Sequence, residues 1–135
     1  MALIDWDEKL SVNVKSIDEQ HKKLIGLINL LHDSMKEGKA KDIMNKVLGD
    51  LADYTDYHFQ TEEKYFQQFN YPEFVKHKKE HDDLRKEVLN LKNKLDKGEG
   101  IITIEVMYFL KDWLSKHILG SDKKYSSFFN SKGVI

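Results

Sequence analysis

Apolar residues recur every three or four positions along four segments of this sequence, which is the period of a helix with one buried face. The third segment shows the pattern most regularly, on a stripe formed by Phe74, His77, His81, Leu84, Val88, Leu91 and Leu95. The pattern predicts helices over residues 17–37, 42–69, 73–96 and 102–122. Ser16 and Glu19 have the spacing of a capping box, which predicts that the first helix opens after Ser16. Pro72 separates the second helix from the third.

The segments between the predicted helices are short, so neighbouring helices are expected to run antiparallel. The sequence therefore predicts an all-α protein, an up-down-up-down antiparallel four-helix bundle. A chain of 135 residues forms a single domain, here residues 1–135. Residues 1–15 are expected to form an N-terminal arm and residues 123–135 a short irregular tail.

The charge balance changes the range of expected partners. The chain has 22 Lys and Arg against 23 Asp and Glu, a net charge of −1, which gives no general attraction to nucleic acid or to an anionic membrane. No apolar run approaches the roughly 20 residues that cross a bilayer, and the first residues lack the features of a signal peptide. With no cysteine, the cytoplasm is the expected compartment, and any metal must be held by nitrogen and oxygen. The mixed surface fits a monomer.

Polar residues interrupt the apolar stripes of all four predicted helices. They are His21, His58, Glu62, His77, His81 and His117. A lone histidine on an apolar face is commonly satisfied by one hydrogen bond, whereas a lone buried glutamate is costly unless it is paired or binds a cation. The pairs HxxxE and HxxxH place two side chains on adjacent turns of one face, where both can reach one centre.

The positions of the histidines along their helices also indicate that these side chains meet. At about 1.5 Å per residue, His21 and His81 lie roughly 22 to 24 Å before the ends of their helices, and His58 and His117 lie the same distance after the starts of theirs. In an antiparallel bundle these positions meet at one level. His32 shares the face of His21 but lies roughly 16 Å along the axis, so it is expected to be an ordinary core-edge or surface histidine.

Asp122 follows His117 by five residues, which is too far for the two side chains to share one face of a regular α-helix. Gly120 lies between them, and a π-type bulge or frayed turn over residues 118–122 would bring them together. An acidic residue at a helix C-terminus is disfavoured by the helix dipole, so a cation nearby is an attractive explanation. The alternative is a solvated aspartate.

Five imidazoles and two carboxylates are too many donors for one zinc ion, which usually takes four ligands. They fit two six-coordinate ions if both carboxylates bridge, and their chemistry suits iron or manganese. With three histidines on one ion and two on the other, the second ion keeps an open position. A small ligand can bind there.

The motifs that contain these residues resemble those of the hemerythrins, especially the single-domain bacterial form called bacteriohemerythrin. They are DEQHKKL around His21, HFQTE with His58 and Glu62, HKKEH with His77 and His81, and HILGSD with His117 and Asp122. The resemblance covers nearly the whole chain. It implies a non-haem centre of two iron ions, with a bridging oxo or hydroxo group, that binds dioxygen reversibly for oxygen storage, delivery or transport.

The resemblance also assigns roles to the residues. One iron would be held by His77, His81 and His117, the open iron by His21 and His58, and both by Glu62 and Asp122. The apolar oxygen pocket would be lined by Phe59, Trp113 and Ile118. Tyr125, three residues after Asp122, would either support that carboxylate or simply pack. An oxygen-consuming enzyme is the expected protein partner.

Other functions remain open on the sequence alone. Ferritin-like di-iron oxidases use Glu-x-x-His motifs, and this sequence contains none, so we expect a protein that is not an enzyme. An oxygen sensor that acts by docking to a partner protein is the main alternative. A bundle without metal is the remaining one.

Overall fold

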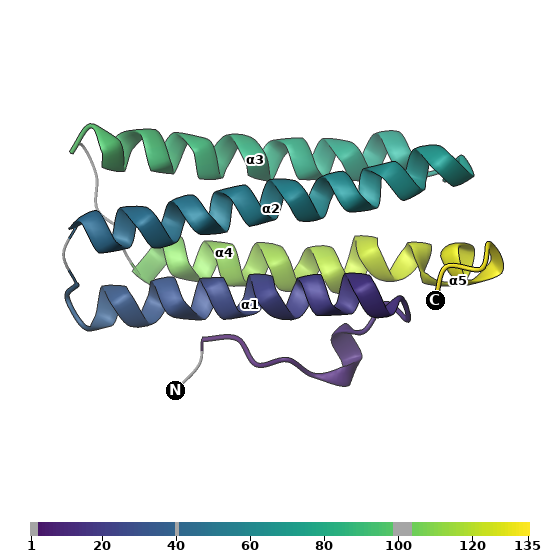
Figure 1. Ribbon diagram of the computed structural model, residues 1–135, viewed down its shortest axis with the longest axis horizontal. Coiled ribbons are helices and arrows are strands. Elements are labelled where there is room, and N and C mark those ends of the chain that lie inside the picture. The colour runs from purple at the N-terminus through teal and green to yellow at the C-terminus, as the bar shows by residue number, and fades with distance from the viewer. Residues whose placement is uncertain (1–2, 40, 99–103) are drawn as a thin grey trace.

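Four long helices lie side by side, and successive helices run in opposite directions (Figure 1). This computed structural model describes residues 3–39, 41–98 and 104–135. The elements in that part of the chain are η1 (Glu8–Leu10), α1 (Lys15–Lys36), α2 (Lys41–Phe69), α3 (Phe74–Asp96), α4 (Ile104–Lys116), the π-helix η2 (His117–Asp122) and α5 (Lys123–Ser131). The predicted all-α four-helix bundle is confirmed.

The start of α1 differs from the prediction. The helix begins at Lys15, its N-cap residue is Val14, and no side chain caps it, so the predicted capping box is wrong. The Asp18 carboxylate acts in the first turn instead, where the helix dipole favours negative charge. It accepts hydrogen bonds from the Val12 backbone N–H at 2.8 Å and from the Ser11 hydroxyl at 2.6 Å. These bonds tie the arm to the helix that follows it.

The C-terminal segment also differs, because residues 123–131 form the helix α5 where an irregular tail was predicted. Tyr125 and Phe129, four residues apart, are completely buried. Phe129 packs against Tyr65 and Phe66 of α2, with ring centroids 5.5 and 5.7 Å apart. Burial of these rings against the end of α2 stabilises the helical conformation of residues 123–131. The predicted start of the fourth helix, residue 102, lies outside the described residues.

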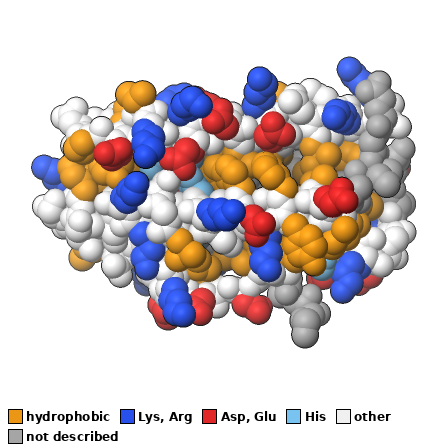
Figure 2. Space-filling model, turned by 180° about the vertical axis from the view of Figure 1, so that it is seen from behind, with side chains coloured by type: hydrophobic (Ala, Val, Ile, Leu, Met, Phe, Trp, Pro, Cys, Tyr) orange, Lys and Arg blue, Asp and Glu red, His pale blue; other side chains and the backbone are white. Residues whose placement is uncertain are grey.

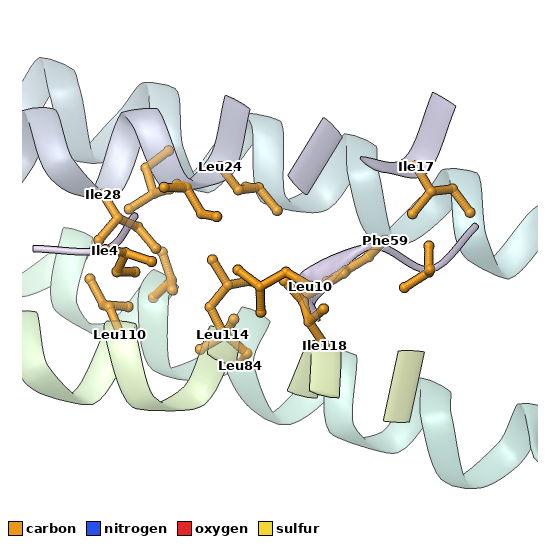
Figure 3. Close-up of a cluster of buried hydrophobic side chains, with 14 of the residues drawn as sticks. Ile4, Leu10, Ile17, Leu24, Ile28, Phe59, Leu84, Leu110, Leu114 and Ile118 are labelled. Atoms are coloured by element: carbon orange, nitrogen blue, oxygen red, sulfur yellow. The ribbon is translucent and has the colours of Figure 1, made fainter. Parts of the chain in front are cut away.

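The N-terminal arm runs back along α1 (Figure 1). The Asn29 side chain holds it, accepting from the Ile4 N–H at 2.9 Å and donating to the Ile4 carbonyl at 2.8 Å. Ile4 and Leu10 lie beside apolar side chains of the bundle core (Figure 3). At the other end of the arm, the Ser126 hydroxyl of α5 donates to the Val12 carbonyl. The arm and α5 therefore join at the end of the bundle where α1 begins.

The surface and the core have different compositions. Figure 3 shows apolar side chains of several helices, Leu24 and Ile28 among them, turned into one interior. On the face seen in Figure 2, Lys, Arg, Asp and Glu alternate with small apolar patches, in keeping with the balanced net charge. In the described ranges, none of the helices combines the length and hydropathy needed to cross a membrane.

Candidate metal centre

The seven polar residues that the sequence singled out come together inside the bundle. They form two overlapping groups, in each of which the candidate ligand atoms lie within 4.8 Å of one another. One group is Glu62, His77, His81, His117 and Asp122, and the other is His21, His58, Glu62 and Asp122. Every member is buried, with at most 4% of its surface exposed. His32 lies outside both groups.

Each side of the bundle contributes to the centre. His21 comes from α1, His58 and Glu62 from α2, and the pair His77 and His81 from α3. The spacing of four residues stacks the α3 pair on one face, with ring centroids 4.6 Å apart. The amphipathic period that buries the apolar stripe thus also turns these rings inward.

The fourth side is the π-helix, which the spacing of His117 and Asp122 predicted. The Lys123 N–H donates to the Ile118 carbonyl five residues earlier, which is the hydrogen bond of a π turn. This wider turn places His117 and Asp122 on one face, with His117 Nε2 3.1 Å from Asp122 Oδ1. The turn is continued by α5, so Asp122 does not end the helix.

The two carboxylates lie between the histidine groups. Oε1 of Glu62 is 3.2 Å from both His58 Nε2 and His81 Nε2. Asp122 places Oδ2 3.1 Å from His21 Nε2 and Oδ1 2.8 Å from His77 Nε2. Each carboxylate therefore contacts one histidine of the pair and at least one of the trio, which is the position that a bridging ligand needs.

The sequence left Tyr125 either to support Asp122 or simply to pack, and the structure shows a contact with the other carboxylate. Its hydroxyl donates to Glu62 Oε2, not to Asp122. Tyr125 lies on α5, which packs over the end of α2, and this packing directs its ring towards the α2 carboxylate. Burial and the nearby Glu62 raise the pKa of Tyr125 well above its usual value, so the hydroxyl stays a donor.

Many polar atoms of the centre lack hydrogen bonds. Although the atoms lie at contact distance, no hydrogen-bond partner within the described ranges serves either ring nitrogen of His21, Nε2 of His81, Oε1 of Glu62 or either oxygen of Asp122. The Nε2 atoms of His77 and His117, by contrast, pair with one another at 3.1 Å. Buried polar atoms rarely go unpaired, because each unpaired group costs free energy. Converging imidazole nitrogens and carboxylate oxygens that lack hydrogen bonds fit metal cations.

The protonation of the centre indicates the same need for positive charge. Burial alone would raise the pKa of Asp122, but His117, His21 and His77 hold it well below its usual value. Burial would lower the pKa of His117, but Asp122, Glu62 and Glu80 raise it to about 9. The buried carboxylates thus stay ionised and draw a proton to a histidine. Metal ions would supply this positive charge directly.

Three histidines have partners that the sequence analysis missed. Nδ1 of His58 donates to Gln20 at 2.7 Å, Nδ1 of His81 to Glu63 at 2.8 Å, and Nδ1 of His117 to Glu80 at 3.1 Å. Such bonds fix the tautomer and turn Nε2 towards the centre. Glu63 and Glu80 directly neighbour the candidate ligands in the sequence, which was the available signal. Gln20 likewise neighbours the candidate ligand His21, although its partner His58 lies 38 residues away.

Two of the three predicted pocket residues contact histidines of the centre. Phe59 stacks on His81 with centroids 3.8 Å apart, and Trp113 stacks on His117 at 4.4 Å. Both line a cavity of about 20 Å³, the space of one small molecule. Ile118 is fully buried but does not line that cavity. The other lining residues are Leu24, Ile28, Leu51, Thr55, Leu84, Val88, Leu110 and Leu114.

Comparison with known proteins agrees with this geometry. The family model described as the hemerythrin HHE cation binding domain matches residues 12–128. The chain belongs to the hemerythrin family. This membership confirms the resemblance of the motifs.

Two relatives and one solved structure match over more than nine tenths of their own length. The bacteriohemerythrin of Methylococcus capsulatus is 37% identical over 93% of this chain and 95% of its own. A hemerythrin-like protein of Naegleria gruberi is 35% identical over 97% of this chain and 92% of its own. A crystal structure of wild-type hemerythrin matches with a TM-score of 0.90 and 35% identity, over 93% of this chain and 97% of that one. The hemerythrin fold is therefore present from the arm to α5.

Proposed function

We propose that this hemerythrin binds dioxygen reversibly at a centre of two iron ions and serves in oxygen storage, delivery or transport within the cytoplasm. The observation that carries the proposal is the pair of overlapping ligand groups, with five imidazoles, two shared carboxylates and several polar atoms that lack hydrogen bonds. Imidazole and carboxylate donors without thiolate suit iron. When bound, the two ferrous ions supply the electrons that dioxygen accepts and returns on release.

We propose that the protein ligands are divided unequally between the two ions. His77, His81 and His117 would hold one iron, and His21 and His58 the other. Glu62 and Asp122 would bridge the two, with an oxo or hydroxo group between them. The ion with two histidines has one protein donor fewer, so this is the ion with a position for dioxygen.

The side chains around the centre restrict water. Phe59 lies beside both His58 and His81, with centroids 5.8 and 3.8 Å away, and belongs to the cavity wall. The Thr55 hydroxyl in that wall donates to the Leu51 carbonyl at 2.6 Å and so offers its proton to the backbone. A dry cavity limits the proton supply that would release reduced oxygen irreversibly, and this favours reversible binding.

We also propose that the protein is a carrier and not an oxidase. Five neutral imidazoles against two carboxylates give less anionic charge than the Glu-rich sites of ferritin-like oxidases. Less anionic charge stabilises high-valent iron less. An oxygen-consuming enzyme is the proposed recipient of the oxygen.

The test is to load the protein with iron, reduce it without oxygen, admit air, and then remove the oxygen again. We expect a visible spectrum that appears with air and disappears on its removal. His58→Ala should abolish the change, whereas His32→Ala removes a buried histidine outside the centre and should retain it. An unchanged spectrum, or turnover of a substrate with oxygen consumed in excess over iron, would contradict the proposal.

A further inference from the structure

The histidines of the centre differ in what holds their outward-facing nitrogen. In the group with three histidines, Nδ1 of His81 donates to the carboxylate of Glu63 and Nδ1 of His117 to the carboxylate of Glu80. Two of the three rings are therefore backed by a negative charge. These acceptors are separate from Glu62 and Asp122, which face the centre itself.

The group with two histidines has no such charge behind it. Nδ1 of His58 donates to the side-chain amide oxygen of Gln20 at 2.7 Å. Nδ1 of His21 has no hydrogen-bond partner within the described ranges. The partners of this group are therefore neutral or missing.

Other side chains keep the two outer carboxylates in place. Arg85 donates to Glu63 Oε2 at 2.9 Å and to Oε1 at 3.2 Å, while its other bonds reach Asp56 and Asp82. The Ser121 hydroxyl donates to Glu80 at 2.7 Å. The Glu63 side chain is only 12% exposed and that of Glu80 34%, so solvent screens their charges incompletely. Arg85 offsets part of the Glu63 charge but leaves its bond to His81 intact.

We propose that Glu63, Glu80 and Gln20 are positioning residues that make the two metal positions unequal. The more basic histidine ligands then hold the ion bound by His77, His81 and His117. A carboxylate that accepts from the outer nitrogen raises the basicity of the inner nitrogen, whereas an amide does so less. The ion with three histidines is thus held more firmly, and the ion with two is left more electron-poor and more exchangeable. The inference rests on the proposed function, because it assumes that two ions bind.

Metal affinity tests the inference without oxygen chemistry. Co²⁺ is titrated anaerobically into the metal-free protein against a competing chelator, which resolves two binding steps. Glu63→Gln and Glu80→Gln keep an acceptor of the same shape but remove the charge. Each variant is expected to weaken the same binding step, that of the ion held by three histidines, by about 10- to 100-fold. Gln20→Glu adds a charge behind His58 and is expected to strengthen the other step.

Glu87→Gln is the matched control, since Glu87 lies seven residues from Glu80 on the exposed side of α3 and should change neither step. A gain in metal affinity in Gln20→Glu would distinguish an effect of charge from structural support. A residue that only supports the structure would not raise the affinity of either metal position when it is replaced. The inference is overturned alone if the parent protein binds two ions but Glu63→Gln and Glu80→Gln leave both steps unchanged, or if Gln20→Glu fails to strengthen either. A parent protein that binds fewer than two ions overturns the proposed function as well.

Discussion

Removal of iron should lower the thermal stability of this protein by a large margin. The metal-free centre confines two ionised carboxylates and five imidazoles where at most 4% of any residue's surface is exposed. Its unpaired donors cost stability in the folded state, and the unfolded chain regains water for each of them. Bound ions remove this cost and bind only the folded state.

The magnitude follows from the two ligand groups. An ion present at about 100 times its Kd stabilises the folded state by about 2.7 kcal/mol, so two ions contribute about 5 kcal/mol. A chain of 135 residues has an unfolding entropy of about 0.28 kcal/mol/K, so each kcal/mol moves the Tm by about 3 to 4 °C. We therefore expect the metal-free protein to melt about 15 to 20 °C below the iron-loaded one.

The assay is a calorimetric or circular-dichroism melt of the iron-loaded, chelated and reloaded protein. Glu62→Gln is the informative variant, because Glu62 belongs to both ligand groups. It should lose most of the iron-dependent gain, because both ions lose a shared carboxylate ligand. The reasoning is refuted if iron-loaded and chelated parent protein melt within about 2 °C of one another.

Three further substitutions test other contacts. Phe59→Ala should lower the free energy of unfolding in urea by about 3 to 5 kcal/mol, because the ring is buried. It should also speed the irreversible oxidation of the iron-loaded protein in air, because water can enter the cavity. Equal oxidation rates would contradict a dry cavity. Tyr125→Phe leaves Glu62 without its hydroxyl donor and should cost about 1 to 3 kcal/mol in the metal-free protein, measured by the same unfolding curves; a neutral result would show that the bond contributes nothing. Asn29→Ala removes both bonds to the arm and should make residues 3–10 more sensitive to limited proteolysis at unchanged iron content, whereas lost iron would contradict a purely local role.

Much of the fold was accessible from the sequence because its signals are local. A period of three to four residues determines which face of a helix is buried, and histidines on that face must enter the core with it. The five-residue interval from His117 to Asp122 predicted a π turn for the same reason, since backbone geometry relates spacing to direction. The spacing of Tyr125 and Phe129 is also a local helical signal. It did not show, however, that α2 would cover these two rings.

Only the packed helices determined which groups meet across them. Tyr125 bonds Glu62 instead of Asp122, and Gln20 meets His58, because these contacts depend on how far each helix is rotated and shifted against its neighbour. A single sequence contains the residues of such pairs but not the rotation that joins them. The sequence by itself therefore determined the four helices and brought seven donors to one level of the bundle. The tertiary structure determined the charge behind each imidazole and the walls of the cavity, because these depend on distances between separate helices.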